Sequence, residues 1–395
     1  MSRGCGLCRW SSVWCIGVLI GLVSCASSAD VSAPGDRAMI TIMRGPFPPR
    51  TYACRRTSVP IVVDGVVDAA WSRAPWSEPF VDIEGSRRPA PRHQTTMAMM
   101  WDDEALYIIA RMDEPHLWAT YTTRDSVIYH ENDFEVFIDP DGDTHNYTEI
   151  EVNALNTVWD LLLVKPYRNG GPAIDAYDIV GLRTAVGLEG TLNDPSDVDR
   201  GWIAEFAIPW TAFADTTDVA LPPNVGDRWR MNFSRVQWRI DPAEDGYIKR
   251  GNPVTGTTFP EDNWVWSPQR QIAMHEPEFW GIVEFDSDDG APFIRAPSVY
   301  GDDRAAFMLR EWTNDIARAM AQPLPYRLRF STITEVMAPP SGWDWPPALI
   351  VEGAQWRAEL HDVPSDGVGR TMVLHHDGRC VIVASPYRDT QDAAP

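Results

Sequence analysis

The stretch from Asn132 to Asp139, NDFEVFID, determines the fold class that the sequence predicts. Side chains of a β-strand point alternately to its two faces, so Phe134, Val136 and Ile138 share one face and Glu135 lies on the other. An apolar face opposite a face that carries a carboxylate is typical of a strand that covers a core on one side. We therefore expect a sheet whose second face presents polar groups.

Short runs rich in β-branched and aromatic residues surround this stretch, and turn signals such as Asp102-Asp103 and Asp141-Gly142 separate them. The runs are Ile61–Val63, Met97–Met100, Leu106–Ala110, Tyr147–Val152, Trp159–Val164, Trp202–Ile208, Trp229–Phe233 and Gly281–Phe285. Many short strands without helices between them predict a mainly β fold, an antiparallel β-sandwich of the jelly-roll or immunoglobulin-like type. Pro209–Phe213 predicts a single helical turn.

The pattern changes near Asp286–Gly290, which predicts a linker. Apolar residues recur at helical spacing from Asp302 to Ala321. Four further strand-like runs follow: Ala348–Glu352, Trp356–Leu360, Thr371–His375 and Cys380–Ala384. We therefore expect the sandwich at residues 58–286 and a small α+β appendage at 287–395, whose role the sequence does not indicate.

The amino terminus has the features of an export signal. Arg3 and Arg9 flank an apolar stretch, Trp10–Val23, that is short for a membrane span but suits a signal-peptide core. It leads into small residues around Cys25, as in a bacterial lipobox. We expect a lipoprotein signal peptide at 1–25, lipidation at Cys25, a tether at 26–57 and an exported, lipid-anchored protein at the periplasm or cell surface. An ordinary cleaved signal is the alternative.

The composition excludes several classes of function. With 34 Lys and Arg against 56 Asp and Glu, the net charge is −22, which repels nucleic acid and anionic lipid. We therefore expect no nucleic-acid partner and membrane contact through the lipid anchor only. Cys54 and Cys380 are the cysteines that follow Cys25, and no Cys-x-x-Cys spacing remains to support zinc or thiol redox chemistry. Whether these two cysteines pair stays open.

The polar face of the Asn132–Asp139 strand carries the chemistry. Glu135, together with Glu151 and Asn153 from an expected neighbouring strand, can accept and donate hydrogen bonds to paired hydroxyls. Flat aromatic side chains cover the apolar faces of a pyranose, and 18 Trp residues make such surfaces available. These groups indicate sugar recognition. The alternative is that Glu135 and Asn153 belong to a buried structural network.

Five motifs in the same order resemble those of carbohydrate-binding module family 9. They are Asp64–Trp71 (DGVVDAAW), Trp101–Ile108 (WDDEALYI), Asn132–Asp139 (NDFEVFID), Trp202–Trp210 (WIAEFAIPW) and Phe279–Phe285 (FWGIVEF). The resemblance covers residues 58–286 and implies a β-sandwich that holds a sugar between aromatic rings, with oligosaccharide or polysaccharide as ligand and carbohydrate-active enzymes as partners. A non-catalytic role in polysaccharide capture or breakdown follows from it.

The resemblance also implies site residues. Tyr129 falls at a stacking position, Glu135 and Asn153 at hydrogen-bonding positions, and Asn232 and Arg235 on a strand that supplies another polar contact. The second stacking ring is expected just before the last strand. There this chain has Met274-His275, with Trp264 and Trp266 upstream, so His275 and the two tryptophans complete the predicted carbohydrate-binding set.

Calcium is the one cofactor that the sequence suggests. Asp139, Asp141 and Asp143 surround Gly142 as carboxylates do in loops that bind hard cations, and the family resemblance implies structural calcium. An ordinary solvated turn is the alternative, since the helix-flanked pattern of an EF-hand is missing.

Two other classes of function stay open. A glycoside hydrolase or other carbohydrate-active enzyme needs two carboxylates facing each other across a cleft, and no pair stands in a recognisable catalytic context. A haem or redox sandwich needs axial ligands, for which His130, His145, Met274 and His275 are available.

Overall fold

The computed structural model describes residues 49–287, 348–352, 355–362, 370–375, 377 and 379–384. The predicted signal peptide with Cys25, the first part of the predicted tether and the expected helix at Asp302–Ala321 lie outside the described residues. Among the residues described, no helix has the length and apolar character that a membrane crossing requires.

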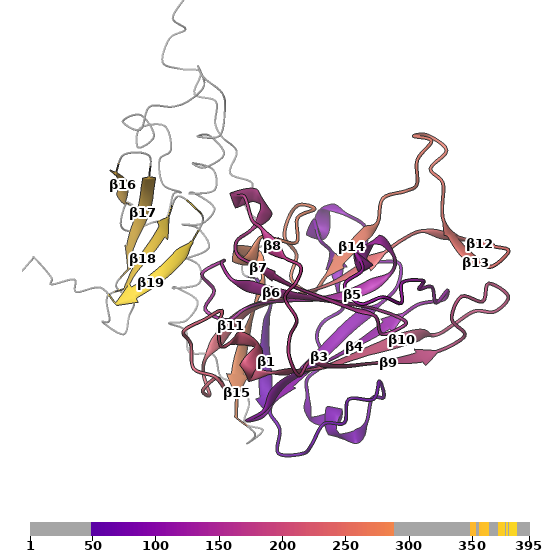
Figure 1. Cartoon of the computed structure of the whole chain (residues 1–395), viewed down its shortest axis with the longest axis horizontal. Helices are drawn as coiled ribbons and strands as arrows, with labels where there is room; N and C mark the ends of the chain where they lie inside the picture. The colour runs from indigo at the N-terminus through magenta and orange to yellow at the C-terminus, as the bar shows by residue number, and fades with distance from the viewer. Residues whose placement is uncertain are drawn as a thin grey trace, which may run out of the picture. The chain divides into compact units, whose positions relative to one another are not determined.

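The prediction of a mainly β fold is confirmed. Strands β1 to β15 fill the region up to Asp286, and short 3-10 helices connect some of them (Figure 1). The strands are β1 (Thr51–Arg56), β2 (Val81–Asp82), β3 (Thr95–Trp101), β4 (Ala105–Asp113), β5 (Asp133–Asp139), β6 (Tyr147–Asn153), β7 (Val158–Leu163), β8 (Ala173–Ile174), β9 (Arg183–Glu189), β10 (Gly201–Pro209), β11 (Arg228–Gln237), β12 (Ile240–Ala243), β13 (Gly246–Lys249), β14 (Asp262–Val265) and β15 (Gly281–Asp286). The 3-10 helices are η1 (Ala69–Arg73), η2 (Gly85–Arg87), η3 (Ile128–His130), η4 (Tyr167–Asn169), η5 (Trp210–Phe213) and η6 (Pro277–Phe279).

One sheet of 13 strands curls so that its two halves face each other. Its order is β8-β7-β6-β5-β11-β15-β1-β3-β4-β10-β9, with β14 and β2 attached beside β11. In Figure 1 the half with β5 to β7 lies above the half with β3, β4, β9 and β10. The apolar residues between the halves form the core, where the rings of Phe134 and Phe206 lie 6.0 Å apart.

The alternation predicted for β5 is confirmed. Phe134, Val136 and Ile138 belong to the core, whereas Glu135 and Phe137 point to the outer face of this half of the sheet. The same alternation along β6 places Glu149 and Glu151 on that outer face, because paired residues on neighbouring strands share a face. The sheet thus collects carboxylates on one surface.

The folded region begins earlier than predicted. β1 lies within the segment expected to be a tether, 26–57, yet it pairs in parallel with β15 and with β3 near the middle of the sheet. The reason is that its apolar side chains are needed in the core: Tyr52 and Cys54 are buried, and Cys54 is a free thiol. Because of β1 the sheet is mixed rather than purely antiparallel.

The strand predicted at Ile61–Val63 is wrong, since this segment is irregular. It covers the outer face of the other half of the sheet, where Ile61 and Trp71 pack on β10 and β4. Its turn is held by Glu205, whose carboxylate accepts hydrogen bonds from the backbone N–H groups of Asp64 and Gly65. The other predicted strands of the sandwich and the helical turn at Pro209–Phe213 are present. Most of their ends agree within one residue, but β3 begins two residues earlier than predicted, and β4 and β11 continue three and four residues further.

A second, four-stranded antiparallel sheet lies near the carboxyl end. Its strands are β16 (Ala348–Glu352), β17 (Gln355–Asp362), β18 (Arg370–His375) and β19 (Cys380–Ala384), in this order. All four coincide with strands predicted from the sequence.

Candidate functional site

A cavity of about 420 Å³ opens on the outer face of β5, β6 and β7. Its wall combines aromatic side chains, carboxylates and one histidine. The lining residues that matter for the argument below are Tyr129, Glu135, Glu149, Glu151, Trp159, Tyr167 and His275. Tyr129, Glu135 and His275 were predicted as site residues, and the structure brings these three together.

Three glutamates form the floor of the cavity. Glu135 on β5 faces Glu151 on β6, and Glu149 lies one step further along the same face. All three are at least 96% buried, with exposed fractions of 4%, 1% and 4%. Burial raises the pKa of Glu135 to about 7 and raises the pKa values of Glu149 and Glu151 well above their ordinary range. The floor therefore holds protons, or needs a cation, at neutral pH.

Tyr129 and Trp159 form an aromatic wall beside this floor. Their ring centroids lie 6.4 Å apart with an angle of 24° between the planes. The backbone of Tyr129 is fixed at both ends: its N–H donates to Glu151 at 3.0 Å, and its carbonyl accepts from the Trp238 indole at 2.9 Å. Trp159 is held by Asp175, which accepts its indole N–H at 2.7 Å. The Tyr129 side chain is 39% exposed, so the ring is available to a ligand.

His275 and Tyr167 contribute to another part of the cavity lining. The His275 Nδ1 atom is hydrogen-bonded to the Tyr147 hydroxyl at 3.0 Å, and its ring lies edge-on to Tyr167, 4.5 Å between centroids. Burial, followed by the positive charge of Arg168, lowers the pKa of His275 to about 4. The imidazole is therefore neutral at physiological pH, although Glu149 lies 3.9 Å from its Nε2 atom.

Asn153 and Asn232 lie outside the lining of this cavity. Asn153 is fully buried; its amide donates to Tyr121 and Glu131, and its oxygen accepts from the backbone of Leu155 and Thr157. These bonds shape the turn after β6.

Asn232 is also fully buried, and it holds Ser267 through two hydrogen bonds of 2.9 Å. In this structure both asparagines position loops next to the site.

Arg235, Trp264 and Trp266 lie apart from the Glu135 cavity as well. Arg235 is on the opposite face of β11, because side chains alternate along the strand and Arg235 follows the core residues Met231 and Phe233 at intervals of two. Its guanidinium forms an ion pair with Glu114 at 2.9 Å. Trp266 is 2% exposed and packs in the core, directly under Gly281. Trp264, 3% exposed, lines a second and larger cavity.

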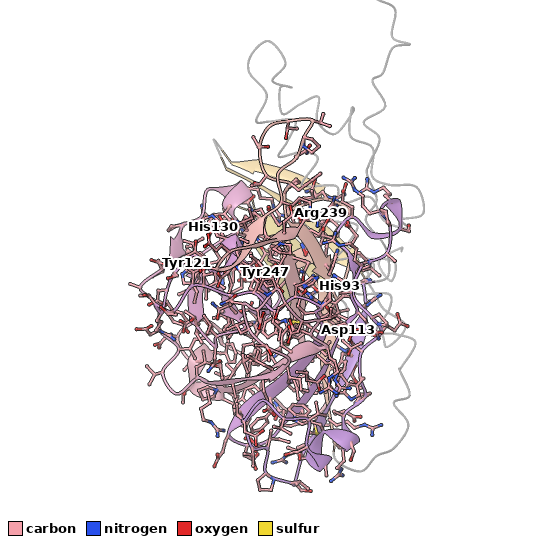
Figure 2. The ribbon with its side chains drawn as sticks, turned by 90° about the vertical axis from the view of Figure 1, so that its right-hand side faces the viewer. His93, Asp113, Tyr121, His130, Arg239 and Tyr247 are labelled. Atoms are coloured by element: carbon pink, nitrogen blue, oxygen red, sulfur yellow. The ribbon has the colours of Figure 1, made fainter. Side chains whose placement is uncertain are left out.

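That second cavity has a volume of about 830 Å³ and includes His93 and Arg239, which Figure 2 labels on the face toward the viewer. Its aromatic faces are already covered by cations. Arg92 and Arg235 each lie 5.3 Å from the ring centre of Trp264, and Lys249 lies 3.2 Å from that of Trp238. Such cation–π pairs occupy the surfaces on which a sugar would stack. The smaller cavity, with Tyr129 exposed, is therefore the better candidate site.

Asp139, Asp141 and Asp143 do place carboxylate oxygens within 4.8 Å of one another, as a metal loop requires. Much of their hydrogen-bonding capacity is used by the loop itself. Both oxygens of Asp139 accept from backbone N–H groups, at 2.9 Å each, and Asp141 and Asp143 also accept backbone N–H groups. These bonds are those of a tight turn, and calcium at this position stays a prediction.

Sequence reasoning missed Trp159, Tyr167 and Glu149 as lining residues. The alternation along β6 and β7 contains the signal for two of them, since Glu149 and Trp159 share the face of Glu151. The pairing register that brings them together was unknown. Tyr167 lies in η4 after β7, and nothing in its local sequence indicates that it reaches the cavity.

The fold and the cavity define a class: a curled β-sandwich with an open aromatic and carboxylate site on its outer sheet face. Residues 63–226 match the protein family described as "Carbohydrate family 9 binding domain-like". The family resemblance indicated by the sequence motifs is thus confirmed over these residues.

Two curated proteins are similar to part of the chain. "Endo-1,4-beta-xylanase A" of Thermoanaerobacterium saccharolyticum is 28% identical over 191 residues, 47% of this chain and 14% of that protein. "Exoglucanase XynX" of Acetivibrio thermocellus is 28% identical over 152 residues, 38% of this chain and 12% of that protein. The chain thus matches only a small part of either relative.

Among solved structures, a carbohydrate binding module family 9 from Caldicellulosiruptor kristjanssonii in complex with cellotriose aligns with a TM-score of 0.38 and 18% identity, covering 63% of this chain and 100% of that one. A putative carbohydrate-binding protein from Bacteroides uniformis aligns with a TM-score of 0.44 and 16% identity, covering 60% and 100%.

Proposed function

We propose that the cavity beside Tyr129 binds a sugar unit of an oligosaccharide or polysaccharide and does not cleave it. The observation that carries this proposal is the exposed ring of Tyr129 next to the buried carboxylates of Glu135 and Glu151. A pyranose has apolar faces and a rim of hydroxyls. A site that binds it therefore needs a flat apolar surface for one face of the sugar and acceptor groups at the rim for the hydroxyls. The family match over residues 63–226 supports the same ligand class.

The aromatic wall of Tyr129 and Trp159 contacts one face of the sugar only. A sugar ring held between two parallel aromatic rings needs about 3.5–4 Å of contact distance on each side, or roughly 7–8 Å between the rings. Tyr129 and Trp159 are 6.4 Å apart, which leaves no room for a sugar between them. They form one platform, and the ligand stacks on its open face while Glu135 accepts hydroxyl hydrogen bonds.

Export and lipid anchoring are part of the proposal. The basic residues Arg3 and Arg9, the apolar stretch after them and Cys25 support a lipoprotein signal. A bound lipid would keep the sugar site at the cell envelope, where it could hold polysaccharide near enzymes that degrade it. Expression of the full chain with a labelled fatty acid tests this: the label should be incorporated, and Cys25→Ala should abolish incorporation.

Calorimetric titration with cello- and xylo-oligosaccharides tests the binding function; the names of the two curated relatives guide this choice of probes. We expect affinities in the micromolar to millimolar range, as shallow hydroxyl-rich sites allow. Tyr129→Ala should weaken binding about tenfold, since a stacked ring contributes on the order of 1–1.5 kcal/mol. Trp76→Ala is the matched control, because Trp76 is similarly exposed at 37% but lies outside the cavity lining.

The same samples decide between binder and enzyme. A reducing-end assay on the titrated oligosaccharides should show no hydrolysis. Measurable turnover that disappears in Glu135→Gln would make the site a glycoside hydrolase, and equal affinity in wild type and Tyr129→Ala would rule out the aromatic platform.

A further inference from the structure

Three buried carboxylates lie close together, and two of them line the floor of the cavity. Asp133, Glu135 and Glu151 each place one oxygen within 4.8 Å of the other two. Asp133 is fully buried, and Glu135 and Glu151 are 4% and 1% exposed. A Ca²⁺ ion holds oxygen ligands at about 2.4 Å, so oxygens that share one ion lie within about 5 Å of one another. The spacing therefore fits a single hard cation.

Hydrogen bonds satisfy only part of this group. Asp133 Oδ1 accepts from Val236 N at 3.2 Å, and Glu151 Oε2 accepts from Tyr129 N at 3.0 Å. Asp133 Oδ2 and Glu135 Oε2 are buried and have no hydrogen-bond partner among the described residues. Within the same part of the chain, no Lys, Arg or His forms an ion pair with any of the three carboxylates. Two buried carboxylate oxygens thus lack a hydrogen-bond partner among the described residues, which is unfavourable unless a proton or a cation occupies the site.

We propose that Asp133, Glu135 and Glu151 bind one divalent cation of the hard, oxygen-preferring class, with Ca²⁺ the expected ion, at the floor of the cavity. Glu135 and Glu151 line the cavity and Asp133 does not, so the ion lies at the boundary between the cavity and the sheet. Its remaining coordination positions face the ligand space. Neighbouring hydroxyls of a sugar replace water there, a step that rests on the proposed function, whereas the ion site itself does not.

Calcium titration into the EDTA-treated full chain tests the ion site. Asp133→Asn keeps the size of the side chain and the acceptor for Val236 but removes the charge, and Asp133 is not part of the cavity lining. We expect this variant to weaken Ca²⁺ binding about tenfold or more, as loss of a charged oxygen ligand does. Asp141→Asn is the matched control, because Asp141 belongs to a different acidic cluster, with Asp139 and Asp143. It should leave calcium binding by Asp133, Glu135 and Glu151 unchanged.

Thermal unfolding guards against a folding artefact. Removal of an unpaired buried charge does not weaken the apo protein, so in EDTA Asp133→Asn and Glu151→Gln should unfold at or above the wild-type temperature. Added Ca²⁺ should raise the Tm of the wild type more than that of these variants. A wild type whose Tm and calorimetric signal do not change with Ca²⁺, or a Ca²⁺ response that is as large in both variants as in the wild type, overturns the ion site.

Sugar titrations in Ca²⁺ and in EDTA separate the two proposals. We expect the affinity for cello- or xylo-oligosaccharide to fall about tenfold in EDTA, since the ion supplies charged contacts to hydroxyls. Sugar binding that is equal in EDTA and Ca²⁺ overturns the contact between ion and sugar. Ca²⁺ binding without sugar binding in either buffer overturns the proposed function and supports the ion site alone.

Discussion

Two buried glutamates lie on the outer faces of the two halves of the curled sheet, and their surroundings differ. Glu205 lies on the outer face of the β10 half, which the segment around Ile61–Trp71 covers. Glu135 lies on the outer face of the β5 half, where a cavity remains open. Glu205 is fully buried and Glu135 is 4% exposed, so burial alone does not distinguish them.

Their partners do. The Glu205 carboxylate accepts from Asp64 N and Gly65 N, both at 2.9 Å, and from the Trp71 indole at 2.8 Å. Glu135 has an oxygen with no hydrogen-bond partner among the described residues. A buried carboxylate with three donors stabilises a fold, whereas one with an unpaired oxygen is retained at a cost in stability. The difference separates a structural acid from one that is available to a ligand.

The largest expected effect on stability comes from a substitution at Glu205, the carboxylate whose hydrogen bonds are complete. Glu205→Gln leaves one oxygen for three donors and turns an amide NH₂ toward an N–H group. We expect the free energy of unfolding to fall by about 3–5 kcal/mol, as loss of charge-assisted bonds to buried donors implies. Urea denaturation followed by tryptophan fluorescence measures it, because Trp71 lies at the site.

The turn that Glu205 holds provides an independent check. Gly65 has φ +79°, and a Cβ there would lie 2.5 Å from the backbone nitrogen of Gly187. Gly65→Ala should therefore destabilise the protein as Glu205→Gln does, and the two losses should not add, because both release the same segment. Fully additive losses would mean that Glu205 acts elsewhere.

The second prediction concerns His275, a basic residue in the lining of the Glu135 cavity. Its pKa in the folded protein, about 4, lies below its ordinary value of 6.5. A lowered histidine pKa means that the unfolded chain takes up the proton first, so stability is lost as pH falls from about 6.5 to 4, by roughly 3 kcal/mol at most. The groups that face the ring are Tyr147, Tyr167, Glu149 and Arg168.

Unfolding measured at pH 7.5 and at pH 4 for wild type and His275→Gln isolates this contribution. The wild type should lose more stability between the two pH values than the variant does. An equal loss would mean that His275 takes up its proton at the same pH in the folded and in the unfolded protein, so that its pKa is not lowered by folding.

The third prediction is a change in stability of the opposite sign to the first. Glu135→Gln removes a buried charge that lacks a full set of donors, so in EDTA at pH 8 we expect stability to rise by about 1–2 kcal/mol. The same substitution type thus has opposite signs at Glu205 and Glu135. A loss at Glu135 as large as that at Glu205 would show that Glu135 has a structural partner and would remove the contrast.

The sequence predicted the parts of this contrast that depend on local pattern. Alternation along β5 placed Glu135 opposite the core, and the family resemblance implied a stacking position at Tyr129, which lines the same cavity. Pairing register and loop packing are not local, so the sequence could not show that Asn153 and Asn232 are consumed by loop hydrogen bonds. The alternation along β11 could have predicted that Arg235 does not belong to the site, because every second residue of that strand, Arg235 included, faces the core.

Position in the sheet also explains the boundary error at the amino end. β1 is a six-residue strand whose sequence, TYACRR, has little β-branched character. It is a strand because β15 and β3 lie on either side of it, and both come much later in the chain. Tertiary pairing of this kind outweighs local propensity.

The smallest expected effect is on sugar affinity, and it comes from a substitution at Tyr129 in the open cavity. Tyr129→Phe keeps the ring and removes only the hydroxyl, for which no hydrogen bond is found among the described residues. If the ring plane binds the sugar, calorimetry should give an affinity within about twofold of the wild type, less than 0.5 kcal/mol, while Tyr129→Ala loses about tenfold. If Tyr129→Phe loses as much as Tyr129→Ala, the hydroxyl is the contact and the stacking platform is wrong. The two substitutions therefore distinguish a flat apolar surface from a polar one at the same position.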